Sequence, residues 1–311
     1  MLPLIIVNPA SAGGATGDAW PGLASELARH FGPFNCAFTE GRGEAAEIAE
    51  REARAGRSFM VACGGDGTVS EVADGILRSG ADAEMGLLPS GTGGDFRRTL
   101  NIPLRASEAA RILRGGQTRR MDAGRVSFMN DAGAEESRYF VNVASFGMGS
   151  DVIERVKENS WLPSGASRLL GGRLAFAAAA IQTAVLFEKP AVHIRLDEGR
   201  ESRLVVTNFC VANARFFGGG MKIAPEANLS DGLFDVVAIG DMSPLKILAN
   251  SYRVYLGAHL GMREVSHARA RRVKARTASG EEVKLEVDGE LLGRLPAEFE
   301  ILPGALRVRC P

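Results

Sequence analysis

A glycine-rich turn that carries its own carboxylate is the feature of this chain best suited to chemistry. Residues 64–68 read Gly-Gly-Asp-Gly-Thr; they follow an apolar run at 59–63 and precede an amphipathic helical pattern. Glycines at a strand-to-helix turn let backbone N–H groups approach a ligand, and the start of a helix favours negative charge. A phosphate-binding turn that contains an acid, Asp66, indicates phosphoryl transfer with a metal ion.

A second turn of the same kind follows the apolar run at 85–88. Residues 89–96 read Pro-Ser-Gly-Thr-Gly-Gly-Asp-Phe and again contain a threonine, Thr92, and an acid, Asp95. Threonine hydroxyls bind phosphate oxygens, and carboxylates hold Mg²⁺ or a proton. Neither Gly-x-x-x-x-Gly-Lys-Ser/Thr nor Gly-x-Gly-x-x-Gly occurs. One glycine-rich turn is more often only a turn, but two that share this composition favour a nucleotide site.

The elements that must position these turns alternate along the first part of the chain. We expect strands at 4–7, 34–38, 59–63 and 85–88, and helices at 20–30, 44–55, after Thr68 and at 106–113. This alternation predicts a parallel sheet covered by helices. Ligands of such sheets bind beyond the carboxyl ends of the strands, which is where the glycine-rich turns fall.

The pattern changes near residue 126 to short β-branched or alternating runs separated by turn residues. We expect strands at 139–144, 191–196, 204–212, 233–239, 272–277 and 283–287, and helices at 168–187 and 244–260. These runs predict a mostly antiparallel, sandwich-like second domain.

Composition limits the partners and the compartment. Lys plus Arg and Asp plus Glu both number 37, so net charge gives no argument for nucleic-acid binding. The four cysteines are widely scattered, which supports neither a zinc site nor a disulfide framework and favours a cytoplasmic setting. The apolar run at 174–187 is too short to span a membrane, and residues 1–7 read as a first strand rather than a signal peptide.

The motifs resemble those of a known family. Asn8-Pro9, 64–68 and 89–96, in this order and spacing, resemble the diacylglycerol kinase catalytic domain superfamily, which includes sphingosine kinases and is distantly related to NAD kinases and 6-phosphofructokinases. Gly94 stands where the family usually has Asn. Residues 141–149, 213–227 and 231–236 are similar to its bacterial soluble branch, so the resemblance covers nearly the whole chain.

The resemblance implies both a fold and a division of the chain. It implies an α/β nucleotide-binding domain at 1–124, with a parallel sheet like that of NAD kinase and 6-phosphofructokinase. It also implies a mostly antiparallel β-sandwich at 125–299 that binds lipid, with residues 300–311 packing back on the first domain.

The resemblance further implies roles for individual residues. Asp66 and Glu290 would be catalytic, Glu290 as the base that deprotonates the lipid hydroxyl. Active-site Mg²⁺ would be held by Asp95 and Asp122, although Asp122 is equally an ordinary crossover residue. The implied nucleotide contacts are Asn8, Thr39, Gly64, Gly65, Gly67, Thr68, Gly91, Thr92 and Asp95. A structural Mg²⁺ would be held by Asn228, Asp231 and Leu233. From the residues alone, Asp231-Gly232 is a tight turn and 287–290 a hairpin turn.

The sequence thus predicts a kinase that uses ATP and Mg²⁺ to phosphorylate a diacylglycerol-like or sphingoid lipid. Its substrate would be a lipid at the inner face of the membrane, and the protein would be a cytoplasmic enzyme that binds this surface peripherally. The sequence leaves open whether it forms a homodimer. The alternatives are a kinase of a soluble acceptor and a nucleotide- or lipid-binding protein without turnover. The helix at 168–187 is either a lipid-facing wall or a buried helix. The basic run at 269–276 is either a solvated strand face or a contact for anionic head groups.

Overall fold

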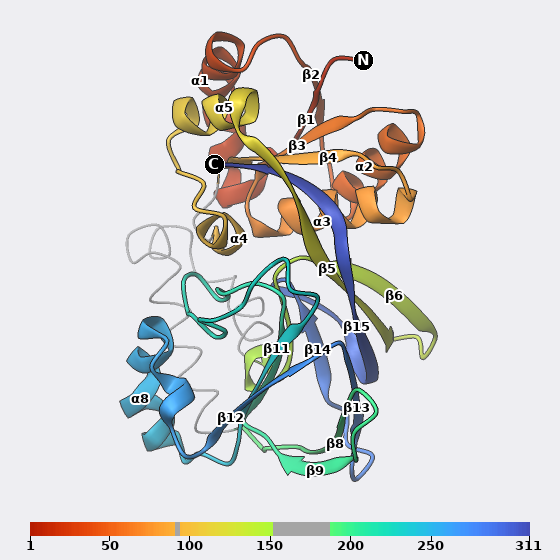
Figure 1. The fold of residues 1–311 in the computed structure, drawn as a ribbon, viewed down its shortest axis with the longest axis vertical. Coiled ribbons are helices and arrows are strands. Elements are labelled where there is room, and N and C mark those ends of the chain that lie inside the picture. Colours follow the sequence, from red (N-terminus) through yellow and green to blue (C-terminus); the bar gives the residue numbers. More distant parts are fainter. Residues whose placement is uncertain (91–93, 152–186) are drawn as a thin grey trace.

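The computed structural model describes residues 1–90, 94–151 and 187–311, and it divides into two halves joined by long strands. Figure 1 shows a helix-covered half that carries the N-terminus and a β-rich half that carries α8 (Pro244–Leu256) on its outer side. Strands β5 (Gln117–Met129) and β15 (Glu290–Cys310) run between the halves. The expected helix at 168–187 lies almost entirely outside the described residues.

The first half has the parallel, helix-covered sheet that the sequence predicts. Its strands pair in the order β2-β1-β3-β4, all parallel. The strands are β1 (Leu4–Val7), β2 (Asn35–Phe38), β3 (Phe59–Gly64) and β4 (Glu84–Pro89). The helices are η1 (Ser11–Gly14), α1 (Ala15–His30), α2 (Glu44–Arg54), α3 (Asp66–Ser79), α4 (Asp95–Thr99) and α5 (Ala106–Gly115).

Burial explains why these segments form these elements. Every residue of β1 and β3 is buried, as expected of strands covered on both faces. Helix α2 buries Ala45, Ile48 and Ala49, whose spacing makes one apolar stripe. Its close contact with α3 depends on Gly75, because a Cβ there would lie 2.2 Å from the carbonyl oxygen of Ala46. The two helices are therefore fixed around the first glycine-rich turn.

The second half is the expected antiparallel β-sandwich. Its strands are β6 (Glu135–Phe140), β7 (Val143–Gly147), β8 (Ala191–Leu196), β9 (Ser202–Val205), β10 (Asn208–Ala212), β11 (Phe234–Ile239), β12 (Val265–Ala270), β13 (Arg272–Thr277) and β14 (Lys284–Val287), with η3 (His259–Gly261) after α8. Strands β12-β11-β10-β7-β14 form one antiparallel series. Stacked aromatic rings fill the core: Phe140 lies 5.7 Å from Phe234, and Phe146 lies 4.9 Å from Phe209.

Strands β5 and β15 make the two halves one hydrogen-bonded sheet. They pair antiparallel from Arg294–Met129 to Cys310–Gln117, with register shifts between residues 294 and 297 and between 302 and 306. Near its end β15 also pairs parallel with β4. The guanidinium of Arg309 lies over the ring of Phe59 and pairs with the carboxylate of Glu84 at 2.6 Å. The last residues of the chain therefore lie in the sheet of the first half.

Several sequence expectations need correction. The strand expected at 139–144 is two strands, because the chain breaks at 141–142 to donate backbone N–H groups to Asp288. The strand expected at 204–212 likewise divides into β9 and β10. Strands β5, β12 and β15 were not expected; in β15, Pro296, Pro303 and two glycines interrupt the alternating pattern. No helix among the described residues combines the length and apolarity that crossing a membrane requires.

Candidate active site

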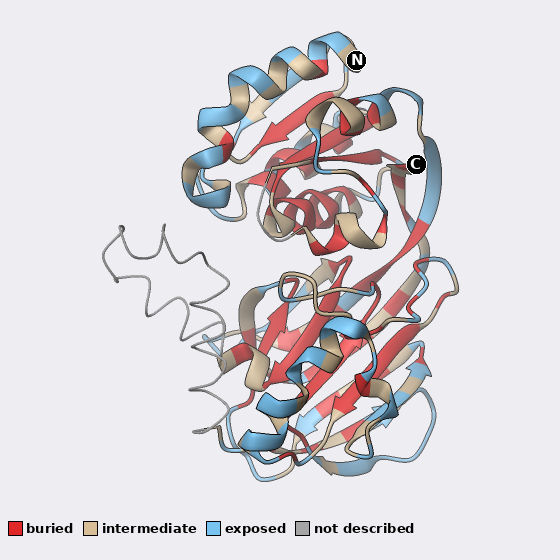
Figure 2. Ribbon diagram, turned by 90° about the vertical axis from the view of Figure 1, so that its left-hand side faces the viewer, coloured by how far each residue is buried: buried red, intermediate tan, exposed pale blue. Residues whose placement is uncertain are grey.

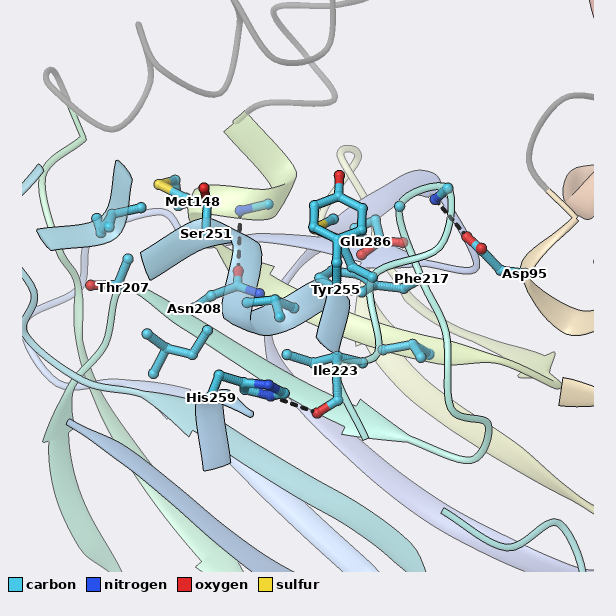
Figure 3. A pocket seen from close by; sticks show the side chains of 18 of the residues that line it. Asp95, Met148, Thr207, Asn208, Phe217, Ile223, Ser251, Tyr255, His259 and Glu286 are labelled. Carbon is cyan, nitrogen blue, oxygen red and sulfur yellow. Dashed lines mark hydrogen bonds between the residues drawn. The ribbon is translucent and has the colours of Figure 1, made fainter. Parts of the chain in front are cut away.

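A cavity of 560 Å³ extends from the glycine-rich turns of the first half to α8 of the second. Four carboxylates line it: Asp66, Asp95, Glu286 and Asp288. The rest of the lining is largely apolar and includes Val143, Met148, Phe217, Ile223, Ile247 and Val254. Figure 3 shows Asp95 at one side of the pocket and Thr207 and Met148 toward the other. One end can therefore hold charged, metal-bound groups, and the remainder suits an apolar chain.

Two polar side chains in the apolar part, those of Asn208 and His259, already have protein partners. Oδ1 of Asn208 accepts from the backbone N–H of Gly149 at 3.1 Å. The ring nitrogen Nε2 of His259 lies 3.0 Å from the carbonyl oxygen of Ile223. Burial lowers the pKa of His259, so the ring is neutral near neutral pH. Oδ1 of Asn142 and Nδ1 of His259, by contrast, have no hydrogen-bond partner among the described residues, although both atoms are almost fully buried.

Asp66 lies at the start of α3 and joins the two glycine-rich turns. Its Oδ1 accepts from the N–H groups of Asp95 and Phe96 at 2.8 and 3.3 Å, and its Oδ2 accepts from Gly94 at 2.6 Å. These are the amides at the start of α4, which has no side-chain cap of its own. The carboxylate thus fixes the second turn against the first.

Asp95 is buried and connects the first half to the second. Its Oδ2 accepts from the backbone N–H of Gly219 at 2.7 Å, and its Oδ1 pairs with Arg98 at 2.7 Å. Burial raises the pKa of Asp95, and the nearby charge of Asp66 raises it further. Because a carboxylate oxygen accepts more than one contact, these bonds leave room for another ligand.

The two aspartates fit a magnesium ion. They line one cavity and their charges repel, so a divalent cation would neutralise both. In phosphoryl-transfer sites Mg²⁺ commonly takes one or two carboxylates and completes its shell with phosphate and water oxygens. Within the described ranges, no three His, Cys, Asp or Glu side chains form a ready-made metal cluster.

The first glycine-rich turn has the form of a phosphate cradle. Nδ2 of Asn8, which follows β1, donates to Oγ1 of Thr68 at 3.1 Å. A Cβ on Gly64 would lie 2.4 Å from Oγ1 of Thr68, whereas one on Gly65 would meet nothing within 4 Å. The first N–H groups of α3 have no intrahelical acceptor. The lack of a side chain at Gly64 therefore makes room for the hydroxyl of Thr68, and the lack of one at Gly65 leaves space for a ligand at the helix start.

The structure describes some of the other predicted nucleotide contacts and not others. Thr39 is buried beside β1, where its N–H donates to the carbonyl oxygen of Val7 at 2.9 Å. Ser90, which belongs to the second turn but is not a predicted contact, is held by Thr16 at 2.8 Å between the hydroxyls. Gly91 and Thr92 lie outside the described residues, so their contacts stay predictions.

Glu290 extends from the start of β15 to the first glycine-rich turn. Its Oε1 lies 3.9 Å from the position that a Cβ on Gly67 would occupy. Its Oε2 lies 3.2 Å from Nη2 of Arg42 and 3.3 Å from Nη2 of Arg138. These are ion pairs without the alignment of a hydrogen bond. The structure thus brings together Glu290 and the turn that contains Asp66, and adds two arginines that the sequence did not indicate.

Asp288 fixes the hairpin that precedes Glu290. Its carboxylate accepts from the N–H groups of Val141, Asn142 and Val143 at 3.0–3.1 Å. Burial raises its pKa to about 6, although these bonds and one from Ser70 favour the charged form. Because Asp288 cannot move without releasing three amides, the direction of Glu290 two residues later is set.

Asp122 does not line the cavity and lies at the crossover between the halves, the second of the two places that the sequence leaves open for it. Its Oδ2 accepts from the N–H of Gly232 at 2.7 Å and its Oδ1 from that of Gly304 at 2.8 Å. Its own N–H donates to the carbonyl oxygen of Leu229. The structure therefore brings Asp122 together with the loop that contains Asn228, Asp231 and Leu233. In this position it fixes the crossover between the halves.

The loop at 228–233 carries the second predicted magnesium site. Oδ1 of Asp231 accepts from the N–H of Leu233 at 3.1 Å, and Oδ2 lies 3.0 Å from Nη2 of Arg269. Oδ1 of Asn228 accepts from the N–H of Ser230. One carboxylate beside backbone carbonyls suits a hard cation, but Arg269 already neutralises the carboxylate. The structural magnesium stays a prediction.

The basic run at 269–276 is paired with acids. Arg272 pairs with Glu300 at 3.0 Å, Lys274 with Glu298 at 2.9 Å and Arg276 with Glu201 at 2.6 Å. These contacts link β13 to its neighbouring strands. They favour the solvated strand face over a contact for lipid head groups.

Comparison with known proteins finds matches along both halves of the chain. Residues 3–126 match the diacylglycerol kinase catalytic domain, and residues 142–310 match the YegS C-terminal NAD kinase β-sandwich-like domain. A diacylglycerol kinase of Mycobacterium tuberculosis is 31% identical over 308 residues, 98% of this chain and 94% of that protein. A probable YegS-like lipid kinase of Pseudomonas aeruginosa is 32% identical over 274 residues, 86% of this chain and 82% of that protein.

Solved structures share the fold. A putative diacylglycerol kinase from Bacillus anthracis superimposes with a TM-score of 0.76 at 22% identity, covering 100% of this chain and 95% of that one. A yeast NADH kinase, solved with NADH, gives a TM-score of 0.52 at 12% identity over 99% of this chain and 82% of that one. At these identities the likeness concerns the fold alone.

Proposed function

Because the chain belongs to the diacylglycerol kinase family, we propose that it transfers the γ-phosphate of ATP to a hydroxyl of a diacylglycerol-like or sphingoid lipid. One observation carries the lipid part of this proposal: the cavity that has Asp66 and Asp95 at one end is otherwise lined largely by apolar side chains. In this proposal residues 1–124 bind the nucleotide and 125–299 the lipid.

Each group at the site then has a role. The start of α3, with Asn8 and Thr68, binds phosphate oxygens. Asp66 and Asp95 would hold Mg²⁺, which supplies neutralisation of the charge that develops on the transferred phosphoryl group. Glu290, beside Gly67, takes the proton from the lipid hydroxyl. Phosphoryl transfer needs mainly positioning and charge stabilisation, and these residues supply both.

The largely apolar lining of the cavity favours a lipid acceptor over a soluble acceptor. A soluble polyol or dinucleotide requires many directed polar contacts, and unpaired polar groups are costly to bury. Asn208 and His259, which lie in the apolar part, are already engaged with the protein. An acyl or sphingoid chain needs no such contacts.

The test is transfer of labelled phosphate from ATP to a total lipid extract, beside a panel of soluble hydroxylated acceptors. We expect a labelled lipid product, absent with Asp66→Ala and absent without Mg²⁺. If label appears only in a soluble acceptor, the lipid proposal is wrong and the protein is a kinase of a soluble acceptor, as NAD kinases are. Nucleotide binding without transfer to any acceptor would indicate a binding protein.

A further inference from the structure

Helix α8 has an exposed apolar face that the proposed reaction does not use. Leu245, Tyr252 and Leu256 are 81%, 55% and 67% exposed, and none of the three lines the cavity. With Leu248 and Tyr255 they fall within roughly 100° of arc around the helix, because an α-helix turns once every 3.6 residues. Figure 2 shows this helix as a mostly exposed element on the surface of the second half. We call these five residues the α8 outer face.

The adjoining side of the same helix is a wall of the cavity. Ile247, Ser251 and Val254 line the cavity from α8. Leu248 and Tyr255 belong both to the cavity lining and to the outer face. Figure 3 shows Ser251 and Tyr255 together on α8 beside the pocket. The apolar surface is therefore continuous from the interior of the cavity to the outside of the helix.

The charge and composition of α8 agree with a lipid surface. The helix has no acidic residue, and its polar flank carries Arg253 and Lys246, of which Lys246 is paired with Glu264 at 2.5 Å. Tyrosine is favoured at the boundary between acyl chains and head groups, where its ring is apolar and its hydroxyl is wet. A helix with apolar and basic sides lies in the plane of a membrane interface.

We propose that the α8 outer face inserts into the surface of a phospholipid bilayer, so that the cavity opens where its lipid substrate lies. This inference rests on the proposed function, since the reason for α8 to meet a bilayer is that the substrate is drawn from it. Anionic phospholipid strengthens the contact through Arg253, and Lys246 contributes only if it leaves Glu264. A lipid then passes from bilayer to cavity along a continuous apolar surface.

The test compares Leu245→Glu/Leu256→Glu with the wild type in co-sedimentation with vesicles of phosphatidylcholine, with and without phosphatidylglycerol. Both leucines are exposed, so their replacement leaves the core intact. Losing the burial of each leucine lowers the vesicle partition constant roughly tenfold or more. The matched control is Leu104→Glu, an exposed leucine of the first half that should bind as the wild type does.

Kinase activity separates this inference from the proposed function. With vesicle-borne diacylglycerol the double variant should lose activity in parallel with binding, whereas with a water-soluble short-chain diacylglycerol it should match the wild type. A wild type that does not bind vesicles, or a double variant that binds no worse than Leu104→Glu, overturns the docking of α8. Vesicle binding that depends on α8 without transfer to any lipid would sink the proposed function and leave the docking surface.

Discussion

The backbone N–H of Gly219 donates to Oδ2 of Asp95 at 2.7 Å, and this bond ties a loop of the second half to α4 of the first. The N–H of Arg215 donates to Oγ1 of Thr99 and joins the same two segments. Gly218, Gly219 and Gly220 all have positive φ, so only glycines give the loop the shape that presents this amide. The acidic end of the cavity thus includes a hydrogen bond that joins the two halves.

Replacing Asp95 should release this loop. In Asp95→Ala the amide of Gly219 has no acceptor, and a hydrogen bond to a charged group contributes about 1.5–3 kcal/mol. Hydrogen exchange at residues 217–221, followed by mass spectrometry, should therefore be roughly tenfold or more faster. Asp95→Asn retains an acceptor oxygen and should stay close to the wild type. Equal exchange in all three proteins would show that the bond does not hold the loop.

Asp66→Ala should reduce both stability and activity. The carboxylate accepts from three amides at the start of α4, and loss of such a cap costs about 1–2 kcal/mol. Urea unfolding should show this loss, and kinase assays should show no turnover. Asp82→Ala is the control: that side chain is exposed and pairs with surface arginines, so stability should change little. Full activity in Asp66→Ala would contradict the proposed mechanism.

Glu290→Gln should reduce kcat while nucleotide binding remains. A positioned general base typically contributes about 10²–10⁴-fold to the rate, and glutamine cannot accept the proton. Calorimetric titration with ATP and steady-state kinetics measure the two quantities separately. Glu298→Gln, on the same strand but paired with Arg272 and Lys274, should leave both unchanged. A Glu290→Gln enzyme that turns over at the wild-type rate would require a different base.

Asp288 should make stability fall as pH rises through its folded pKa. Burial raises that pKa from 3.8 to about 6, so between these values the folded protein binds more protons than the unfolded chain. Below pH 3.8 the carboxyl is protonated in both states, and its contribution to the unfolding free energy is fully present. This contribution is lost as the pH rises past about 6. The difference is on the order of 3 kcal/mol, at 1.36 kcal/mol per pKa unit.

Asp288→Asn isolates this effect. The variant loses acceptor bonds and is less stable overall, but the difference in unfolding free energy between wild type and variant should shrink as pH rises from 4 to 7. Chemical denaturation at several pH values measures this difference. A difference that is constant, or that grows with pH, would contradict the raised pKa.

Filling the cavity from α8 should affect only the lipid substrate. Val254→Trp places a larger apolar side chain on the cavity wall, so the KM for a dispersed short-chain diacylglycerol should rise several-fold while that for ATP is unchanged. Ala249→Trp, at an exposed position of the same helix, is the control. A matching rise in both KM values would place the lipid elsewhere.

The first half of the fold could be predicted because its signals are local. The buried strands β1 and β3 are continuous apolar runs, and the helices show the apolar spacing of their buried faces. The turns that follow β3 and β4 meet because neighbouring parallel strands end at one edge of the sheet. The prediction that Asp66 and Asp95 lie at one site depends on that rule alone.

The parts that were missed depend on contacts distant in sequence. Arg42 and Arg138 meet Glu290 only because the turn between β14 and β15 lies against the first half, and no local pattern marks an arginine for such a pairing. Gly219 belongs to a motif that the sequence shows, but the hydrogen bond from its N–H to Asp95 joins residues that are 124 positions apart in the chain. Asp288 is adjacent to a predicted site residue, and its burial follows only from the packing of β7 and β14.

The pairing of β5 with β15, which is interrupted at two register shifts, has a consequence for how the molecule can move. Two halves joined by a flexible linker can separate by rotating about it, but here a hydrogen-bonded ribbon passes from one half into the other. Rotation would have to bend both strands together, and the two register shifts of β15 are the places where the ribbon is least regular. The ribbon therefore opposes rotation of one half against the other, and any bending should occur first at its register shifts.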